Sequence, residues 1–197
     1  GMLAVNGGNA DLVSRGSALL QQASKNGNAK AKLFLVDHNL LATAPPSAPP
    51  SAKQLETWRT LAEEALSGGQ NGALVVLGTI HWLDAVSGSD IDQISIQTAR
   101  GYFRKAVKHC VQKRDQRKAR KLLAVTYAGV KSEDLTGRRE RAAAHFYAGI
   151  SLWEESQTLE AKKNWNLAME ADHEVTQKLI KRHIESAETS GQSEFAK

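Results

Sequence analysis

The sequence predicts an all-α protein, and three observations support this prediction. Residues that favour helices (Ala, Leu, Gln, Glu, Lys and Arg) are frequent throughout the chain. Proline is rare, with 4 residues in 197, and no run alternates Val, Ile and Thr as a strand would. Amphipathic helical patterns, separated by glycine- and serine-rich breaks, fill the chain instead. With 41% hydrophobic residues at this length, the helices can share one continuous core.

Two helices are predicted before a proline-rich segment. They run from about Asp11 to Ser24 and from about Ala29 to Ala42, and Gly27 between them suits the left-handed residue that follows a helix. Residues 44–51 (APPSAPPS) are incompatible with a helix, because proline lacks the backbone donor and clashes with the preceding turn. We interpret this segment as an extended connector; a proline-motif ligand for another domain is the alternative.

Four more helices are expected between this connector and residue 130. Ser51 is a suitable N-cap for the first of them. Breaks rich in glycine and serine at 67–72 and 87–90 follow the first two helices. The predicted helices cover about 52–66, 73–86, 92–112 and 115–130.

The clearest amphipathic pattern lies in residues 142–171, which predict two helices joined by a turn near Ser156–Thr158. One face of the second helix carries apolar residues at i, i+4 and i+7: Ala161, Trp165 and Ala168. One stripe of the first helix carries small or apolar residues: Phe146, Gly149, Leu152 and Trp153. The small residues allow the two helices to approach closely, and we expect Trp153 and Trp165 to fill the space beside them.

Two series of alanines share one period, which indicates a repeat. In the first helix of each hairpin the steps are 42, 41 and 42 residues, along Ala23, Ala65, Ala106 and Ala148. In the second helix the steps are 42, 46 and 42, along Ala31, Ala73, Ala119 and Ala161. A large apolar residue follows each alanine of the second series by four positions: Leu35, Leu77, Leu123 and Trp165. We therefore predict four helical hairpins, at about 11–43, 52–86, 92–130 and 138–171.

These hairpins resemble tetratricopeptide-like repeats. Ala148-Gly149-x2-Leu152 followed by Ala161-x3-Trp165-x2-Ala168 is similar to the tetratricopeptide pattern, whose period is about 34 residues. The longer period is closer to the Sel-like relatives, which two further runs resemble: Ala73-x3-Leu77-Gly78-x2-His81 and Tyr102-Phe103-Arg104-Lys105-Ala106. The repeats are degenerate, because His81 stands where an aromatic is usual, and Val36 and Ala124 where glycine is usual.

The resemblance implies a right-handed α-α superhelix, or solenoid, of about four degenerate hairpins within a single domain over residues 1–187. A helix from about His173 to Ala187 is expected to cap the stack, and residues 188–197 to form a disordered tail. Proteins of this kind bind ligands on their concave surface. The resemblance places a partner-binding groove at Lys30, Asp37, Thr79, Trp82, Lys118, Lys121 and Trp153. Core packing is the alternative for the two tryptophans.

No catalytic residue, metal site or cofactor is predicted. The histidines lack the His-Glu-x-x-His spacing of a zinc site, and Glu170-x-x-His173 has no second pair to complete a di-iron site. Cys110 follows His109 directly, and adjacent helical residues point about 100° apart, so they cannot form a catalytic pair. The glycines at 67–72 have no strand before them and no lysine after them, which indicates a turn rather than a phosphate loop.

The strongest charge feature is the run from Arg104 to Lys121, which has nine Lys or Arg and one acid, Asp115. Three interpretations are open: a solvated helix face, a surface for an acidic protein or peptide, and a surface for nucleic acid phosphates. Aromatic residues for stacking on bases are not interleaved with these cations, which disfavours nucleic acid. The acidic pair Glu154-Glu155 is interpreted as solvated surface.

These observations favour a non-enzymatic scaffold that binds a protein or peptide, with a basic nucleic-acid-associated protein as the alternative. An enzyme domain whose site is split across helices is a third, less favoured hypothesis. The net charge of +5 permits an acidic partner, and the single cysteine excludes an internal disulfide. No membrane span is expected, and residues 1–10 lack the pattern of a signal peptide. A cytoplasmic location is therefore expected, or a periplasmic one if a leader has been removed ahead of Gly1–Met2.

Overall fold

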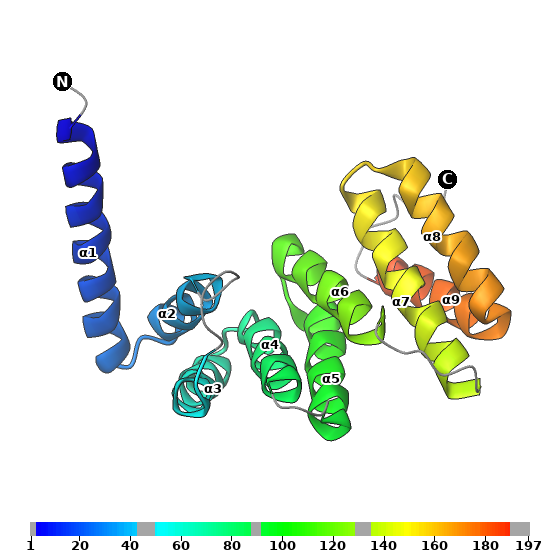
Figure 1. Cartoon of the computed structure of the whole chain (residues 1–197), viewed down its shortest axis with the longest axis horizontal. Coiled ribbons are helices and arrows are strands. Elements are labelled where there is room, and N and C mark those ends of the chain that lie inside the picture. The colour runs from blue at the N-terminus through cyan, green and yellow to red at the C-terminus, as the bar shows by residue number, and fades with distance from the viewer. Residues whose placement is uncertain (1–2, 43–49, 88–91, 129–134, 190–197) are drawn as a thin grey trace. The chain divides into compact units, whose positions relative to one another are not determined.

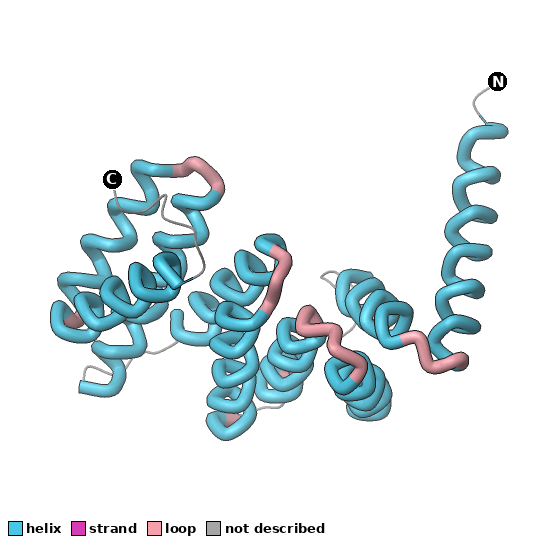
Figure 2. Tube along the Cα trace, turned by 180° about the vertical axis from the view of Figure 1, so that it is seen from behind, coloured by secondary structure: helices cyan, strands magenta, loops and turns pink. Residues whose placement is uncertain are grey.

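The computed structural model describes residues 3–42, 50–87, 92–128 and 135–189. Every regular element in these ranges is an α-helix, and no strand occurs among them, which confirms the all-α prediction (Figures 1 and 2). Most of the predicted connector at 44–51 and most of the predicted tail at 188–197 lie outside the described residues.

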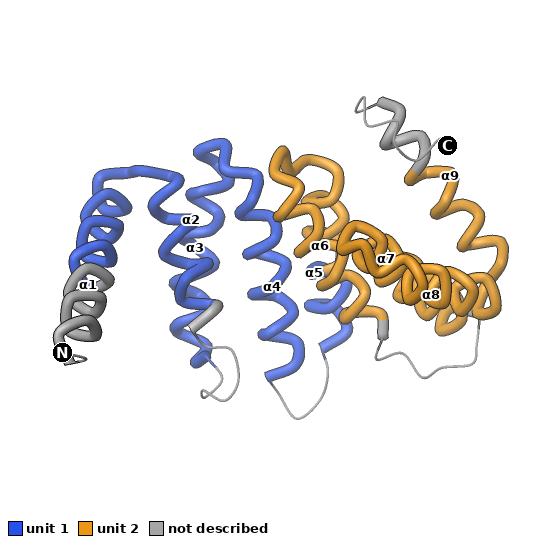
Figure 3. Tube along the Cα trace, turned by 90° about the horizontal axis from the view of Figure 1, so that it is seen from above, with its two compact units in different colours: residues 1–99 blue, residues 100–197 orange. Residues whose placement is uncertain are grey.

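The chain divides into two compact units, residues 1–99 and 100–197, with the boundary inside α5 (Gln93–His109) (Figure 3). The first unit holds four whole helices, and each packs against the next along the chain. These are α1 (Leu3–Lys25), α2 (Ala29–Ala42), α3 (Ala52–Ser67) and α4 (Ala73–Val86).

The second unit holds the remainder of α5 and four further helices. In it α6 packs on α7, α7 on α8, and α9 against both α7 and α8. Their bounds are α6 (Lys113–Ala128), α7 (Leu135–Glu154), α8 (Thr158–Ala171) and α9 (His173–Thr189). The described helices thus pack consecutively, in a repeat-like manner. The superhelix and the single domain over residues 1–187 stay predictions.

The predicted repeat positions mark the core. All four alanines of the second series, on α2, α4, α6 and α8, are buried. The leucines that follow two of them, Leu77 and Leu123, are fully buried as well. In the first series Ala65 and Ala106 are buried, and Ala23 and Ala148 are partly buried. The alanines that define the repeat period in the sequence therefore lie on the buried or partly buried sides of their helices.

Three of the tight turns between helices have the same hydrogen-bond pattern. At the end of α1, Asn28 N donates to Ala23 O, and Gly27 N donates to Ser24 O. This is the Schellman motif, in which the residue after the helix takes a left-handed conformation. The α3–α4 turn repeats it around Gly69, and the α7–α8 turn repeats it around Ser156, with φ values of 82° and 63°.

The shared turn corrects the alignment of the fourth hairpin. In each turn one hydrogen bond spans five residues. Its acceptor carbonyl belongs to Ala23 in α1 and to Ala65 in α3, but to Leu152 in α7. By its turn, Leu152 rather than Ala148 is therefore equivalent to the first two alanines. The pattern shifted because α7 continues for one more helical turn beyond Ala148.

Several helices end or begin away from their predicted bounds. α1 begins at Leu3, ahead of the expected start at Asp11. α5 ends at His109 and α6 begins at Lys113, so Cys110 lies in the turn between them rather than on a helix. The turn is held by Cys110 itself, whose N donates to Ala106 O and whose O accepts from Gln116 Nε2 at 2.7 Å.

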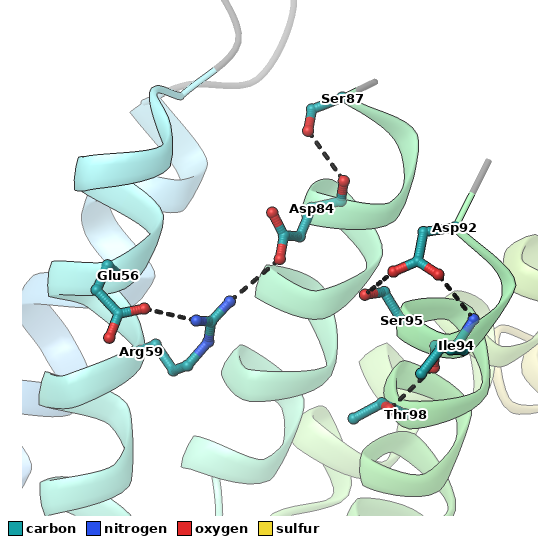
Figure 4. A network of polar contacts seen from close by, with 8 residues as sticks. All are labelled: Glu56, Arg59, Asp84, Ser87, Asp92, Ile94, Ser95 and Thr98. Carbon is teal, nitrogen blue, oxygen red and sulfur yellow. Dashed lines mark hydrogen bonds and ion pairs between the residues drawn. The ribbon is translucent and has the colours of Figure 1, made fainter. Parts of the chain in front are cut away.

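Side-chain caps and ion pairs fix the first unit. The predicted N-cap Ser51 is confirmed, since it forms a capping box with Gln54 at the start of α3. Arg59 of α3 bridges to Asp84 of α4 at 3.2 Å while also pairing with Glu56 on its own helix (Figure 4). At the start of α5, Asp92 accepts a hydrogen bond from Ile94 N and so caps that helix (Figure 4).

The core of the second unit is built on α7, α8 and α9. Its buried centre is Phe146, Ile150 and Ala168, with Tyr147, Trp165, Leu179 and Ile180 packed around them. Asp172 alone separates α8 from α9, and its side chain accepts a hydrogen bond from Val175 N and so caps α9. Buried Thr176 reaches back from α9 to the carbonyl of Ala168, which ties the two helices together.

A buried arginine links α5 to α6 and α7 within this unit. Arg100 is 2% exposed, and its guanidinium donates to Glu140 at 2.6 Å and to the carbonyl of Thr126 at 2.5 Å. It also lies 4.1 Å from the ring centroid of Tyr127. A buried cation is stable only when it is paired in this way, so three helices are held in register by one side chain.

Candidate functional site

The face of α6 that points away from the core is strongly basic. Ala119, Leu123 and Tyr127, at i, i+4 and i+8, are the buried side of the helix. On other positions of its first turns α6 carries cations that line an open depression of about 360 Å³. The lining residues are Lys113, Arg114, Arg117, Lys118, Lys121 and Glu155. We call this surface the basic depression.

The spacing of the cations places them in one short stripe. Lys113, Arg117 and Lys121 follow one another at i, i+4 and i+8, and Arg114 and Lys118 lie beside them. A helix rises about 1.5 Å per residue, so the stripe is about 12 Å long. Five positive charges therefore lie within about two turns of α6, with one acidic residue at their edge.

Two glutamates at the end of α7 pair with this helix, in two different environments. Glu154 contacts Arg120, whose side chain is 8% exposed, and lies 3.8 Å from Arg117 Nε. Glu155 contacts Lys121, and these two side chains are 31% and 54% exposed. The first pair is part of the α6–α7 packing, whereas the second lies at the surface, on the edge of the basic depression.

The interpretation of Glu154-Glu155 as simple solvated surface is wrong for Glu154. Its partly buried carboxylate is an interhelical partner of a buried arginine. The sequence carries no local signal for this contact, because it depends on how α7 packs on α6. A covered acid needs a basic partner, and here that partner is 34 residues away in the sequence.

The cations at the start of α6 differ from those farther along it. Lys113 and Arg114 form no ion pair with any residue in the described ranges, and both are exposed. They lie in the first turn of the helix, where the helix dipole disfavours positive charge and favours an anion. This end of the basic depression is therefore the part most suited to receive a negatively charged group.

The seven predicted groove residues are divided between the two units. Lys118 and Lys121 both line the basic depression. Trp153 of α7 does not line it; its ring centroid lies 5.6 Å from that of Trp165, and it is 36% exposed. Trp153 thus packs on one side and faces solvent on the other.

The other four predicted residues lie in the first unit, on α2 and α4. Lys30 is exposed, with Nζ 5.9 Å from the ring centroid of Phe34, and Asp37 is partly buried. Thr79 donates to the carbonyl of Val75 on its own helix, and Trp82 is partly buried. A groove that contains all seven residues would combine the two units, so it stays a prediction.

A second depression, of about 530 Å³, lies on the exposed face of α8. It is lined by charges of both signs together with the exposed leucines Leu159 and Leu167. Lys162 and Lys163 are matched there by Glu160 and Glu170. This surface offers no net preference for an acidic or a basic ligand.

The reactive side chains lie in packing environments. Burial raises the pKa of the Cys110 thiol to about 11, so the thiol is protonated near neutral pH and is a poor nucleophile. Burial lowers the pKa of His183 to about 4, and burial also lowers the pKa of His81. His145 Nδ1 lies 3.2 Å from Asn164 Oδ1, a side-chain contact between α7 and α8. Within the described ranges, no three His, Cys, Asp or Glu side chains are grouped as a metal would require.

None of the described helices combines the length and the apolar character that crossing a membrane requires. Comparison with protein-family models, with curated proteins and with solved structures gives no match for this chain. The resemblance to tetratricopeptide-like and Sel-like repeats therefore stays a prediction from the motifs.

Proposed function

We propose that this chain is a non-enzymatic scaffold that binds an acidic segment of a partner protein at the basic depression. The observation that carries the proposal is the lining of that surface, with five cations and one acid in a concave space of about 360 Å³. An extended or helical peptide with several carboxylates is complementary to such a surface in charge.

The cost of collecting these charges supports a binding role. Lys113–Arg117, Arg114–Lys118 and Arg117–Lys121 are like-charged pairs at i, i+4, and each destabilises a helix by about 0.2–0.5 kcal/mol. Lys113 and Arg114 also oppose the helix dipole. A bound polyanion relieves both the repulsion between like charges and the unfavourable interaction with the helix dipole. The ligand should therefore stabilise the protein as well as bind to it.

The basic depression already accommodates carboxylates, and its lining offers no surface for base stacking. The C-terminal part of the stripe already pairs with the carboxylates of Glu154 and Glu155. None of the described residues that line the basic depression is aromatic, and single-stranded nucleic acid binding usually relies on aromatic stacking. Nucleic acid is therefore the alternative partner, and the test must distinguish it from an acidic protein segment.

The wider architecture belongs to the same proposal. The hairpins are tetratricopeptide-like or Sel-like repeats, stacked as a solenoid whose concave surface holds the partner. The consecutive packing of helices and the buried repeat alanines support this. In that arrangement Lys118 and Lys121 are the part of the groove that recognises acidic residues.

The test measures binding of a capped hexaglutamate peptide by titration calorimetry. The variant Lys118→Glu with Lys121→Glu should weaken binding by at least about tenfold, since each reversal replaces attraction with repulsion. The control is Lys162→Glu with Lys163→Glu on α8, which changes the net charge equally but lies outside the basic depression. Circular dichroism checks that both variants fold.

Salt dependence separates the two classes of partner. An oligonucleotide that bound through phosphates would lose affinity steeply with salt, with a slope of about −0.7 to −0.9 per contact in a log–log plot. Tighter and steeper binding of the oligonucleotide than of hexaglutamate would favour nucleic acid. If the Lys118→Glu, Lys121→Glu variant and the Lys162→Glu, Lys163→Glu variant bind hexaglutamate with equal affinity, the basic depression is not the binding site.

A further inference from the structure

Among the described residues, Glu155 is the single acidic one that lines the basic depression. Its backbone is fixed by the turn that follows α7. Glu155 N donates to Leu152 O, and two further bonds close the turn around it, from Ser156 N to Trp153 O and from Gln157 N to Leu152 O. Glu155 is therefore held at the edge of the cationic stripe by backbone geometry, and its carboxylate reaches Lys121.

The pair between Glu155 and Lys121 is of the kind that a ligand can replace. Both side chains are partly exposed to solvent, so water screens their attraction and their ordering costs entropy. The neighbouring pair of Glu154 with Arg120 is different, because Arg120 is buried and would be left without compensation if the pair opened. Of the two glutamates, Glu155 is therefore the one that a ligand can displace from its lysine.

A ligand with several carboxylates has the means to displace Glu155. Its first carboxylates can bind at Lys113 and Arg114, which hold no ion pair among the described residues. A further carboxylate on the same chain is then at high effective concentration beside Lys121 and exchanges for Glu155 at little cost. A ligand with a single carboxylate only swaps one ion pair for another there.

We propose that Glu155 is an internal competitor for the acidic ligand, which occupies Lys121 in the unbound protein and sets the affinity of the basic depression for polycarboxylate segments. This inference rests on the proposed function, because it concerns the same surface. Glu155 is an affinity-determining residue in this role: it lowers the affinity for acidic ligands that reach Lys121, and a ligand with several carboxylates still binds through its other contacts.

The experiment compares Glu155→Gln with wild type, using capped hexaglutamate and titration calorimetry at low salt. Glu155→Gln should bind about threefold more tightly, because a negative charge beside the ligand is removed and Lys121 is released. The matched control is Glu160→Gln, which removes one exposed glutamate on α8 and should leave the affinity unchanged.

A double-mutant cycle with Lys121→Met shows whether Glu155 acts through Lys121. The gain from Glu155→Gln should fall to less than about half in the Lys121→Met background, because no cation remains to be released. An equal gain in both backgrounds would overturn the inference, since general repulsion acts whether or not Lys121 is present.

The outcomes distinguish this inference from the function on which it rests. If Lys118→Glu with Lys121→Glu abolishes binding and Glu155→Gln leaves the affinity unchanged, the inference is wrong and the proposed function stands. If wild type does not bind hexaglutamate, both are wrong. Thermal unfolding of Glu155→Gln without ligand separates binding from stability, because an affinity gain should appear without a higher melting temperature.

Discussion

The indole of Trp165 on α8 lies directly against the backbone of Gly149 on α7. A Cβ atom placed on Gly149 would lie 2.3 Å from Trp165 Nε1 and 2.5 Å from Trp165 Cδ1. The two helices can therefore approach as closely as they do only because residue 149 has no side chain. The indole has little room to retreat, since it also packs against Trp153 and the buried cluster around Phe146.

Gly149→Ala should destabilise the protein by about 1–2 kcal/mol. The clash with Trp165 costs about 1–3 kcal/mol, and the better helix propensity of alanine returns part of that. Urea unfolding followed by tryptophan fluorescence measures the change. Gly101→Ala on α5 is the matched control, because a Cβ there meets nothing within 4 Å and the same substitution should be neutral or stabilising. Equal stability of the two variants would contradict the close approach.

The close approach of α7 and α8 at Gly149 could be predicted from the sequence, because periodicity reveals which small residues share a helix face, whereas the direct contact of Trp165 with Gly149 was not predicted. The period of about 42 residues placed the second series of repeat alanines, which are buried on α2, α4, α6 and α8. Such local patterns carry this information because core positions recur with the helical period.

Other features could not be predicted, since they depend on partners far away in the sequence. Arg100 looks like an ordinary surface cation, and its burial follows from Glu140 and the carbonyl of Thr126 on other helices. The end of α5 before Cys110 has no glycine or proline to mark it. In the basic depression, the resemblance to the repeats singled out Lys118 and Lys121, but the position of Glu155 beside Lys121 depends on how α7 lies on α6.

Ser156→Gly should stabilise the protein by about 0.5–1 kcal/mol. Ser156 has a φ of 63°, a left-handed conformation that costs a residue with a Cβ about 1–2 kcal/mol, and glycine loses part of that gain through its more flexible unfolded state. Two equivalent turns already have glycine at this position, Gly27 and Gly69. The measurement is the midpoint of urea unfolding.

The control for this turn is Gln157→Gly. Gln157 has a φ of −86°, which any residue adopts, so glycine there should give no gain or a small loss. In the opposite direction, Gly27→Ala should destabilise the protein by about 1 kcal/mol, through backbone conformation alone, because a Cβ at Gly27 meets nothing within 4 Å. A loss of stability in Ser156→Gly would show that the left-handed turn is not formed.

Arg100→Met should destabilise the protein by about 2–4 kcal/mol. The substitution keeps much of the apolar packing but leaves the partly buried Glu140 carboxylate without its cation and the Thr126 carbonyl without its donor. The double variant Arg100→Met with Glu140→Gln should recover part of the loss, since the unpaired charge is gone. Lys178→Met, which breaks an exposed i,i+4 pair with Glu174, should leave stability almost unchanged. If Arg100→Met is as mild as Lys178→Met, Arg100 does not hold the helices together.

Stability should fall as the pH drops from about 6.5 towards 4, and His183 should account for part of the loss. Burial on α9, with a smaller contribution from Arg120, lowers the pKa of His183 from 6.5 to about 4. The unfolded chain therefore takes up a proton below pH 6.5 that the folded protein resists, so the stabilisation is complete above pH 6.5 and is lost as the pH falls. Burial lowers the pKa of His81 too, so His81 contributes to the same pH dependence of the whole protein.

The difference in unfolding free energy between wild type and His183→Gln isolates the contribution of His183. This difference should change by about 1–2 kcal/mol between neutral pH and pH 4.5. The change is smaller than full burial would give, because the ring is partly solvated. Urea unfolding at a series of pH values measures this difference, and parallel curves for the two proteins would show that the ring of His183 is not held in a buried, neutral form.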